Sequence, residues 1–63
     1  MSRQVDYYNV EVRVHFERNG EDDYSEDDYQ FKTEEEAMKF ANESGEVHDV
    51  LVYYKDGSNK SIW

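Results

Sequence analysis

The chain contains no cysteine, so no disulfide can reinforce its fold, and zinc sites of the cysteine type are excluded. It also lacks any stretch near the roughly 20 consecutive apolar residues that span a membrane. The first four residues are followed by alternating polar and apolar residues rather than by an apolar run, so we expect no signal peptide. Together these absences predict a soluble protein of the cytoplasm.

Positive charge is also scarce. The chain has seven Lys and Arg residues against sixteen Asp and Glu residues, which makes its formal net charge −9. Nucleic acids and anionic lipids attract proteins through Lys and Arg, so we expect neither to be a direct partner. A strongly acidic chain is instead attracted to basic surfaces. The aromatic content of 16% and the regular patterning described below argue against intrinsic disorder.

Catalytic and cofactor signatures are missing from the sequence. No serine lies in a nucleophile elbow, and there is no glycine-rich phosphate loop. The acidic segment 23–28 lacks the central glycine and the spacing of an EF-hand loop. A metal site built on His15 and His48 would need a third ligand, which no motif supplies. We therefore expect no enzymatic activity, no catalytic residue, no cofactor and no metal site.

The clearest periodic pattern lies in the first third of the chain. Apolar residues alternate with polar ones over residues 8–17, which predicts a half-buried strand. Residues 18–20, Arg-Asn-Gly, then provide turn chemistry, because Asn and Gly tolerate positive φ. A second strand follows, with Tyr29 and Phe31 facing inward. Its start is open, since residues 21–27 either continue the hairpin or form an acidic loop.

A capping box begins the predicted helix, with Thr33 as N-cap and Glu36 at the third helical position. The glutamates of the first turn suit the positive end of the helix dipole. Gly45 ends the helix after about ten residues. So short a helix depends on packing for its stability. Its apolar face consists of Ala37, Phe40 and Ala41.

The last third of the chain predicts a second hairpin. Residues 47–54 are rich in branched and aromatic side chains, which favours a third strand. Residues 56–57, Asp-Gly, are a type I′ turn signal, and residues 59–63 would form the fourth strand. A two-residue loop of this kind sets a register in which Leu51 faces Ile62.

These elements predict a single domain, residues 1–63, with an α+β fold of the order ββαββ. Sequential hairpins with one helical return favour a four-stranded antiparallel sheet in the order 2-1-3-4, with the helix packed on one face. The third strand has apolar side chains on both faces, and one helix cannot bury both sets. The surplus gives four candidates for self-association: Leu51, Tyr53, Ile62 and Trp63. The predicted core consists of Tyr8, Val10, Val12, Val14, Phe16, Tyr29, Phe31, Ala37, Phe40, Ala41, Val50 and Val52.

Acidic residues concentrate around the first hairpin, where residues 17–36 hold ten of the sixteen. Alternate residues of a strand lie about 6.6 Å apart, which is comparable with the gap between successive phosphates on one DNA strand. A row of such carboxylates could imitate nucleic-acid phosphates and occupy a basic groove, with Tyr24 as an apolar anchor. The alternative is a solvated loop that serves only solubility. The candidate partner-binding residues are Asp22, Asp23, Tyr24, Glu26, Asp27, Asp28, Glu34 and Glu35.

A family resemblance rests on the run Phe31-Lys32-Thr33-Glu34-Glu35-Glu36-Ala37-Met38-Lys39-Phe40-Ala41. This run lies between a predicted hairpin and a valine-rich strand. It resembles the helix entry of small phage-encoded host inhibitors of ββαβ layout, such as the short inhibitor of bacterial RNA polymerase. The resemblance covers residues 7–54 and implies a similar fold and an inhibitory role in a host cytoplasm. That family uses arginines on its final strand, and residues 50–54 contain none, so no functional residue is carried over. Phage inhibitors of uracil-DNA glycosylase are also similar in acidic composition and in a terminal hairpin.

Two functions are compatible with these patterns. The first is a small, acidic, non-enzymatic protein that occupies a basic surface of a nucleic-acid-binding partner, as a DNA mimic or phage-type inhibitor. The second is a structural homodimer or assembly subunit, in which the acids serve only solubility and the apolar face of the last two strands pairs with a second copy.

Overall fold

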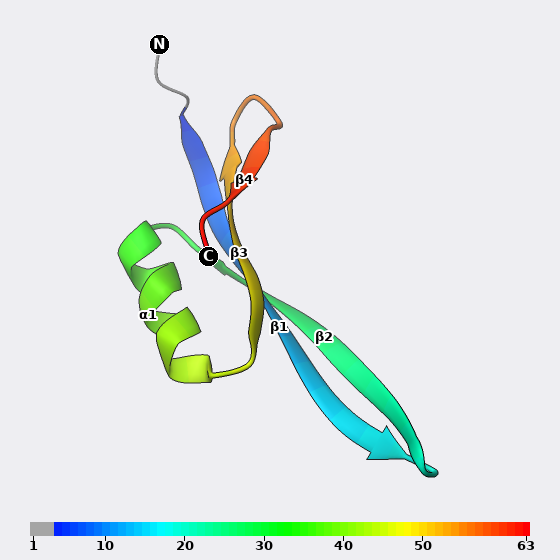
Figure 1. The fold of residues 1–63 in the computed structure, drawn as a ribbon. Helices are drawn as coiled ribbons and strands as arrows, with labels where there is room; N and C mark the ends of the chain where they lie inside the picture. The colour runs from blue at the N-terminus through cyan, green and yellow to red at the C-terminus, as the bar shows by residue number, and fades with distance from the viewer. Residues whose placement is uncertain (1–3) are drawn as a thin grey trace.

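The computed structural model of the protein describes residues 4–63, in which four strands form one antiparallel sheet and one helix covers part of one face (Figure 1). The strands lie in the order β2-β1-β3-β4, so the predicted ββαββ layout and strand order are confirmed. No helix within the described residues has the length and apolar character needed to cross a membrane. The elements are β1 (Val5–Arg18), β2 (Glu21–Phe31), α1 (Glu34–Ser44), β3 (Val47–Tyr54) and β4 (Asn59–Ser61).

A tight turn joins β1 to β2. Asn19 and Gly20 have φ values of 51° and 82°, and positive φ at both central residues defines a type I′ turn, whose twist matches that of the flanking strands. The register then continues without a break from the pair Arg18–Glu21 to the pair Tyr8–Phe31. The acidic residues 21–28 therefore belong to a strand, and the open choice between strand and loop is decided.

The first hairpin extends well beyond the rest of the sheet. β3 pairs with β1 only as far as Val12, so the distal halves of β1 and β2 form a two-stranded ribbon that projects from the body (Figure 1). We call this ribbon, residues 13–26, the arm. It makes the molecule elongated, with dimensions of 52 × 23 × 14 Å.

Local interactions define both ends of α1. Thr33 is the N-cap, and its Oγ1 accepts a hydrogen bond from the backbone N–H of Glu36 at 3.2 Å. The Thr33 hydroxyl also donates to the Glu36 carboxylate at 3.0 Å. Gly45 ends the helix with a φ of 76°, a left-handed conformation that glycine adopts without strain. The predicted helix limits are confirmed.

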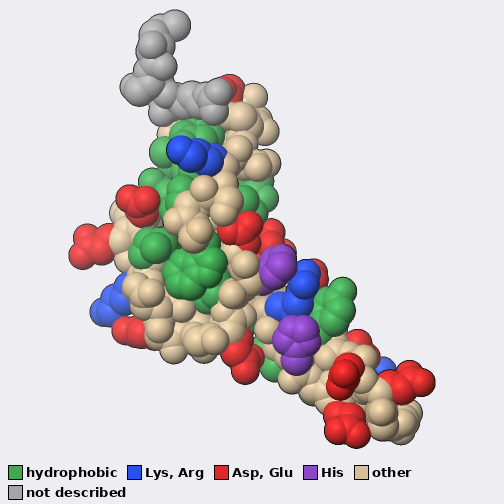
Figure 2. Space-filling model, in the orientation of Figure 1, with side chains coloured by type: hydrophobic (Ala, Val, Ile, Leu, Met, Phe, Trp, Pro, Cys, Tyr) green, Lys and Arg blue, Asp and Glu red, His purple; other side chains and the backbone are tan. Residues whose placement is uncertain are grey.

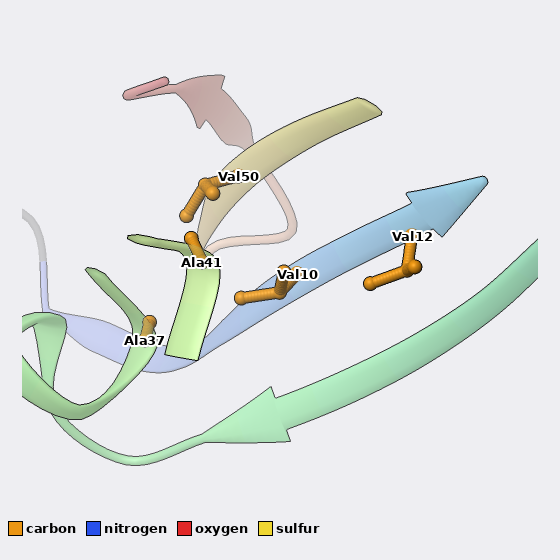
Figure 3. Close-up of a cluster of buried hydrophobic side chains, with 5 residues drawn as sticks. All are labelled: Val10, Val12, Ala37, Ala41 and Val50. Carbon is orange, nitrogen blue, oxygen red and sulfur yellow. The ribbon is translucent and has the colours of Figure 1, made fainter. Parts of the chain in front are cut away.

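The core lies where α1 crosses β1 and β3 (Figure 3). Ala37 and Ala41 are almost fully buried, and their small side chains let the helix approach the sheet closely. Val10 and Val50 are the largest fully buried side chains, and Phe40 extends the contact to β2, with its ring 4.8 Å from that of Tyr29. The half-buried residues around this centre are Tyr8, Val14, Phe31, Met38, Phe40, Val47 and Ile62.

Two predicted core residues lie outside the core. Phe16 is 39% exposed and Tyr29 is 43% exposed. Phe16 has the inward parity of β1, but it lies on the arm, beyond the reach of α1. Tyr29 packs against Phe40 on one side and faces solvent on the other, because β2 is the edge strand of the sheet. Phe16 is therefore exposed because the hairpin is longer than the helix that packs on it.

The predicted register of the second hairpin is wrong by one residue. Tyr54 donates its N–H to the carbonyl of Ser58 at 2.9 Å, which closes a three-residue loop instead of a two-residue one. Within that loop only Gly57 has positive φ, whereas a type I′ turn requires it at two positions. The Asp56 carboxylate accepts the Ser58 N–H at 2.9 Å and stabilises this alternative turn.

This shift moves the last residues to the other face of the sheet, since side chains alternate along a strand. Leu51 lies opposite Ser61, not Ile62. Ile62 donates its N–H to the carbonyl of Val50 at 2.8 Å and packs against the core on the helix side. Trp63 remains 52% exposed.

The limit of the core can be tested with two phenylalanines. We expect Phe40→Ala to lower the free energy of unfolding by about 2–3 kcal/mol, because it removes a ring that joins α1 to β2. Phe16→Ala should lower it by less than about 1 kcal/mol, because that ring is already in contact with water. Urea unfolding followed by circular dichroism measures both, and equal losses would show that the arm belongs to the core.

Candidate functional site

β2 is an open edge of the sheet, and its acidic residues line that edge. The type I′ turn makes Arg18 and Glu21 a hydrogen-bonded pair, so the odd-numbered residues of β2 bond to β1. The even-numbered residues from Asp22 to Asp28 direct their backbone N–H and C=O groups away from the sheet. The outward N–H of Tyr24 already donates to the Asp23 carboxylate at 2.8 Å, and the rest of this edge is available to another molecule.

The β2 carboxylates divide between the two faces of the ribbon. We call the face that α1 covers near the body the helix-side face, and the opposite one the open face. Since the strands pair in register, each acid shares a face with its neighbour on β1. The helix-side face carries Glu21, Asp23 and Asp27, with Ser25 among them, and the open face carries Asp22, Glu26 and Asp28, with Tyr24 among them.

The open face of the arm neutralises part of its own charge. Arg13 Nη2 lies 2.7 Å from Glu26 Oε1, and Arg13 Nε donates to the same oxygen at 3.1 Å. The Arg13 guanidinium also lies over the Tyr24 ring, 4.8 Å from its centre, and the His15 ring packs against Tyr24 at 5.9 Å. Figure 2 shows blue and purple side chains together here. Glu26 and Tyr24 therefore already have partners within the chain.

Both histidines lie near the base of this face. His48 has no partner on β1, because Glu11 pairs with Asp49 and the next pair is Val12 with Val47, which makes His48 the extra residue of a bulge. His15 and His48 line one hollow of about 330 Å³, and Arg13 lies in its wall. Among residues 4–63, no group of three His, Asp or Glu side chains is arranged to hold a metal ion.

The helix-side face of the arm is chemically different. Val14 and Phe16 form an apolar row on β1 and lie directly opposite Ser25 and Asp23 on β2. The Arg18 guanidinium lies 5.8 Å from the centre of the Phe16 ring, near the tip of the arm. Val14 still packs against the core at the edge of α1, so the uncovered part of this face consists of Phe16 beside Asp23.

Glu34 and Glu35 are not part of the same surface as the tip of the arm. They lie in the first turn of α1, after the end of β2 at Phe31. Asp22 is nine residues from that end, and at about 3.3 Å per residue the separation along the strand is about 30 Å. The predicted partner-binding residues thus form one group along β2 and a separate pair at the helix start.

The candidates for self-association are also divided. Tyr53 and Leu51 are half-buried on the open face, where the Tyr53 ring stacks on that of Tyr7 with centres 4.8 Å apart. Ile62 packs against the core on the other side of the sheet, and Trp63 is exposed beyond the end of β4. The structure therefore places Ile62 on the opposite face of the sheet from Leu51 and Tyr53.

Sequence reasoning missed Phe16 as an exposed residue on the arm. A length comparison could have found it. The alternating pattern over residues 8–17 spans about 33 Å as a strand, whereas a helix of about ten residues is only about 15 Å long. One such helix cannot cover the whole apolar row, so part of the row had to be open.

Comparisons of the chain with protein families, with curated proteins and with solved structures find no match. The resemblance to phage-encoded host inhibitors therefore stays a prediction. The function has to be inferred from the residues and geometry of this chain.

The phenol of Tyr53 makes the free energy of unfolding depend on pH, and this dependence tests its surroundings on the open face. Partial burial raises the pKa of its phenol above the ordinary value of 10.0, and Tyr7, Glu11 and Asp28 raise it further. The unfolded chain therefore loses this proton first, so the stabilisation is complete below pH 10 and is lost as pH rises through the folded-state pKa.

We expect Tyr53→Phe to lose less stability than the wild type between pH 8 and pH 11, since the variant has no phenol to ionise at this position. Urea unfolding at the two pH values measures the difference. Equal losses in the two proteins would contradict the assignment of Tyr53 to this acidic surrounding.

Proposed function

We propose that the protein is a non-catalytic binding protein whose acidic arm occupies a basic surface of a partner, namely the nucleic-acid-binding groove of an enzyme. The observation that supports this most directly is the position of β2. It is an exposed edge strand, it carries carboxylates on both faces, and half of it belongs to an arm that projects from the body (Figure 1).

Charge favours a basic partner over other kinds. Residues 21–28 contain six carboxylates and no Lys or Arg. Within residues 4–63, Glu26 is the only one of the six with an ion pair. Each exposed pair with a partner's Lys or Arg would contribute only about 0.2–1 kcal/mol, so several must form together. A groove lined with cations offers that number, and its own ligand is a regularly spaced row of phosphates.

Shape supports the same conclusion. The arm is two strands wide, and the backbone of the molecule spans only 14 Å in its thinnest direction. A narrow, twisted ribbon of this kind can enter a groove, whereas a compact body of the same mass would meet only its rim. Since both faces of β2 carry acids, either wall of such a groove meets negative charge.

Self-association receives less support. Two copies cannot pair along β2, because like charges directly opposite one another destabilise a strand pair. The other edge strand, β4, has only three residues, and one of them is Lys60. Burial of Ile62 in the core removes a further residue from the proposed apolar interface.

The proposal can be tested with two charge-matched variants. Asp27→Asn with Asp28→Asn removes two charges of β2 next to the arm, and Asp6→Asn with Glu43→Gln removes two charges elsewhere. Immobilised wild-type protein should retain nucleic-acid-binding proteins from a bacterial lysate, and both salt and duplex DNA should elute them.

For a partner purified in this way, the Asp27/Asp28 variant should bind about tenfold more weakly, and the Asp6/Glu43 variant should bind as the wild type does. Titration calorimetry at two salt concentrations gives the affinities. Binding that survives duplex DNA, or that weakens equally in the two variants, would exclude the acidic strand β2 as the binding element.

A further inference from the structure

One face of the first hairpin is only half covered. α1 lies over the part of β1 that contains Val10 and Val12, which are 0% and 8% exposed. The same face continues along the arm through Val14, which is half-buried, to Phe16, which is 39% exposed. The apolar row is thus longer than the element that covers it. Val14 still packs against the core, and Phe16 beyond it has no covering element among residues 4–63.

Along β2, opposite this row, the side chains change from aromatic to acidic where the cover of α1 ends. Under the helix, Val10 lies opposite Tyr29, whose ring packs on Phe40 of α1. In the uncovered part, Phe16 lies opposite Asp23, and Asp27 lies at the boundary opposite Val12. An element that covers the distal part must therefore be apolar towards β1 and basic towards β2.

We propose that the partner covers this surface with a basic amphipathic helix, with apolar side chains on Val14 and Phe16 and with Lys or Arg side chains towards Asp23 and Asp27. This inference rests on the proposed function and specifies the chemistry of the partner. α1 already shows that a helix packs on this face of the sheet. A strand added to the β2 edge would leave Phe16 uncovered, since its side chain stands on β1 and perpendicular to the sheet.

The two faces of the arm differ in what they offer a cation. On the open face, Arg13 already occupies Glu26 and covers Tyr24, so an approaching Lys or Arg meets a positive charge there. On the helix-side face the cation of the arm is Arg18, which lies at the tip beside Phe16. The basic side chains of the helix are therefore expected along β2, away from the tip.

The test uses three synthetic peptides as probes. The first is a 14-residue peptide of Leu and Lys with all leucines on one helical face. The second has the same composition in a scrambled order, and the third is oligolysine of equal charge. Wild-type protein should bind the amphipathic peptide about tenfold more tightly than the scrambled one, because only the former can bury Phe16 while its lysines meet the acids.

Phe16→Ser and Tyr24→Ser are matched variants, because each removes an exposed aromatic ring from one face of the arm. Phe16→Ser should abolish the preference for the amphipathic peptide, and Tyr24→Ser should retain it. NMR titration of the wild type should move the amide signals of Val14, Phe16 and Ser25 more than that of Tyr53, and this measurement does not depend on any variant.

The outcomes separate this inference from the proposed function. Equal affinity for all three peptides, weakened by Asp27→Asn with Asp28→Asn, would overturn the amphipathic helix and leave the acidic binding arm in place. A preference lost in Tyr24→Ser and kept in Phe16→Ser would assign binding to the open face and overturn the inference. If no cationic peptide binds, the inference and the proposed function both fall.

Discussion

The length difference between β1 and α1 is the constraint on which the rest of this structure depends. β1 has 14 residues and α1 has 11, but a strand rises about 3.3 Å per residue and a helix only about 1.5 Å. One helix of this size can cover less than half of the strand. The hairpin therefore divides into a part that belongs to the core and a part that stands free as the arm.

The free part would have little stability by itself, since an isolated two-stranded hairpin is marginal in water. Its order follows from the unbroken register with the body, from the type I′ turn at its tip, and from the contacts of Arg13 with Glu26 and Tyr24. Repulsion among the β2 carboxylates opposes these interactions. A basic partner would remove that repulsion, so binding and stabilisation of the arm are expected to favour each other.

The carboxylates of β2 affect two kinds of contact. Between two copies of the chain they prevent pairing along the open edge, which protects a long edge strand from aggregation. Towards a basic protein they act as an attractive surface, and the exposed Phe16 adds an apolar contact beside it. Under the proposed function, the charged edge strand would select a partner by the sign of its charge, and the exposed Phe16 would add a requirement of shape.

Much of the fold was determined by the sequence itself, because the deciding interactions are local. The period-two pattern of β1, the Asn19-Gly20 turn, the Thr33 cap and Gly45 specify the elements through neighbours a few residues away. The strand order follows from their sequence and from the short connections. The acidity of β2 is likewise a property of composition.

Tertiary structure decided what depends on distances between elements. The pattern of β1 gives Val12 and Phe16 the same parity, and only the position of α1 buries the first and exposes the second. The register of the second hairpin is given by the hydrogen bond from Tyr54 to Ser58, and the Asp56 carboxylate supports it by accepting the Ser58 N–H, which the Asp-Gly pair alone does not reveal. The pairing of Arg13 with Glu26, thirteen residues apart, likewise exists only once the strands are aligned. The sequence therefore determined which groups the arm carries, and the reach of the helix decided which of them stay exposed to solvent.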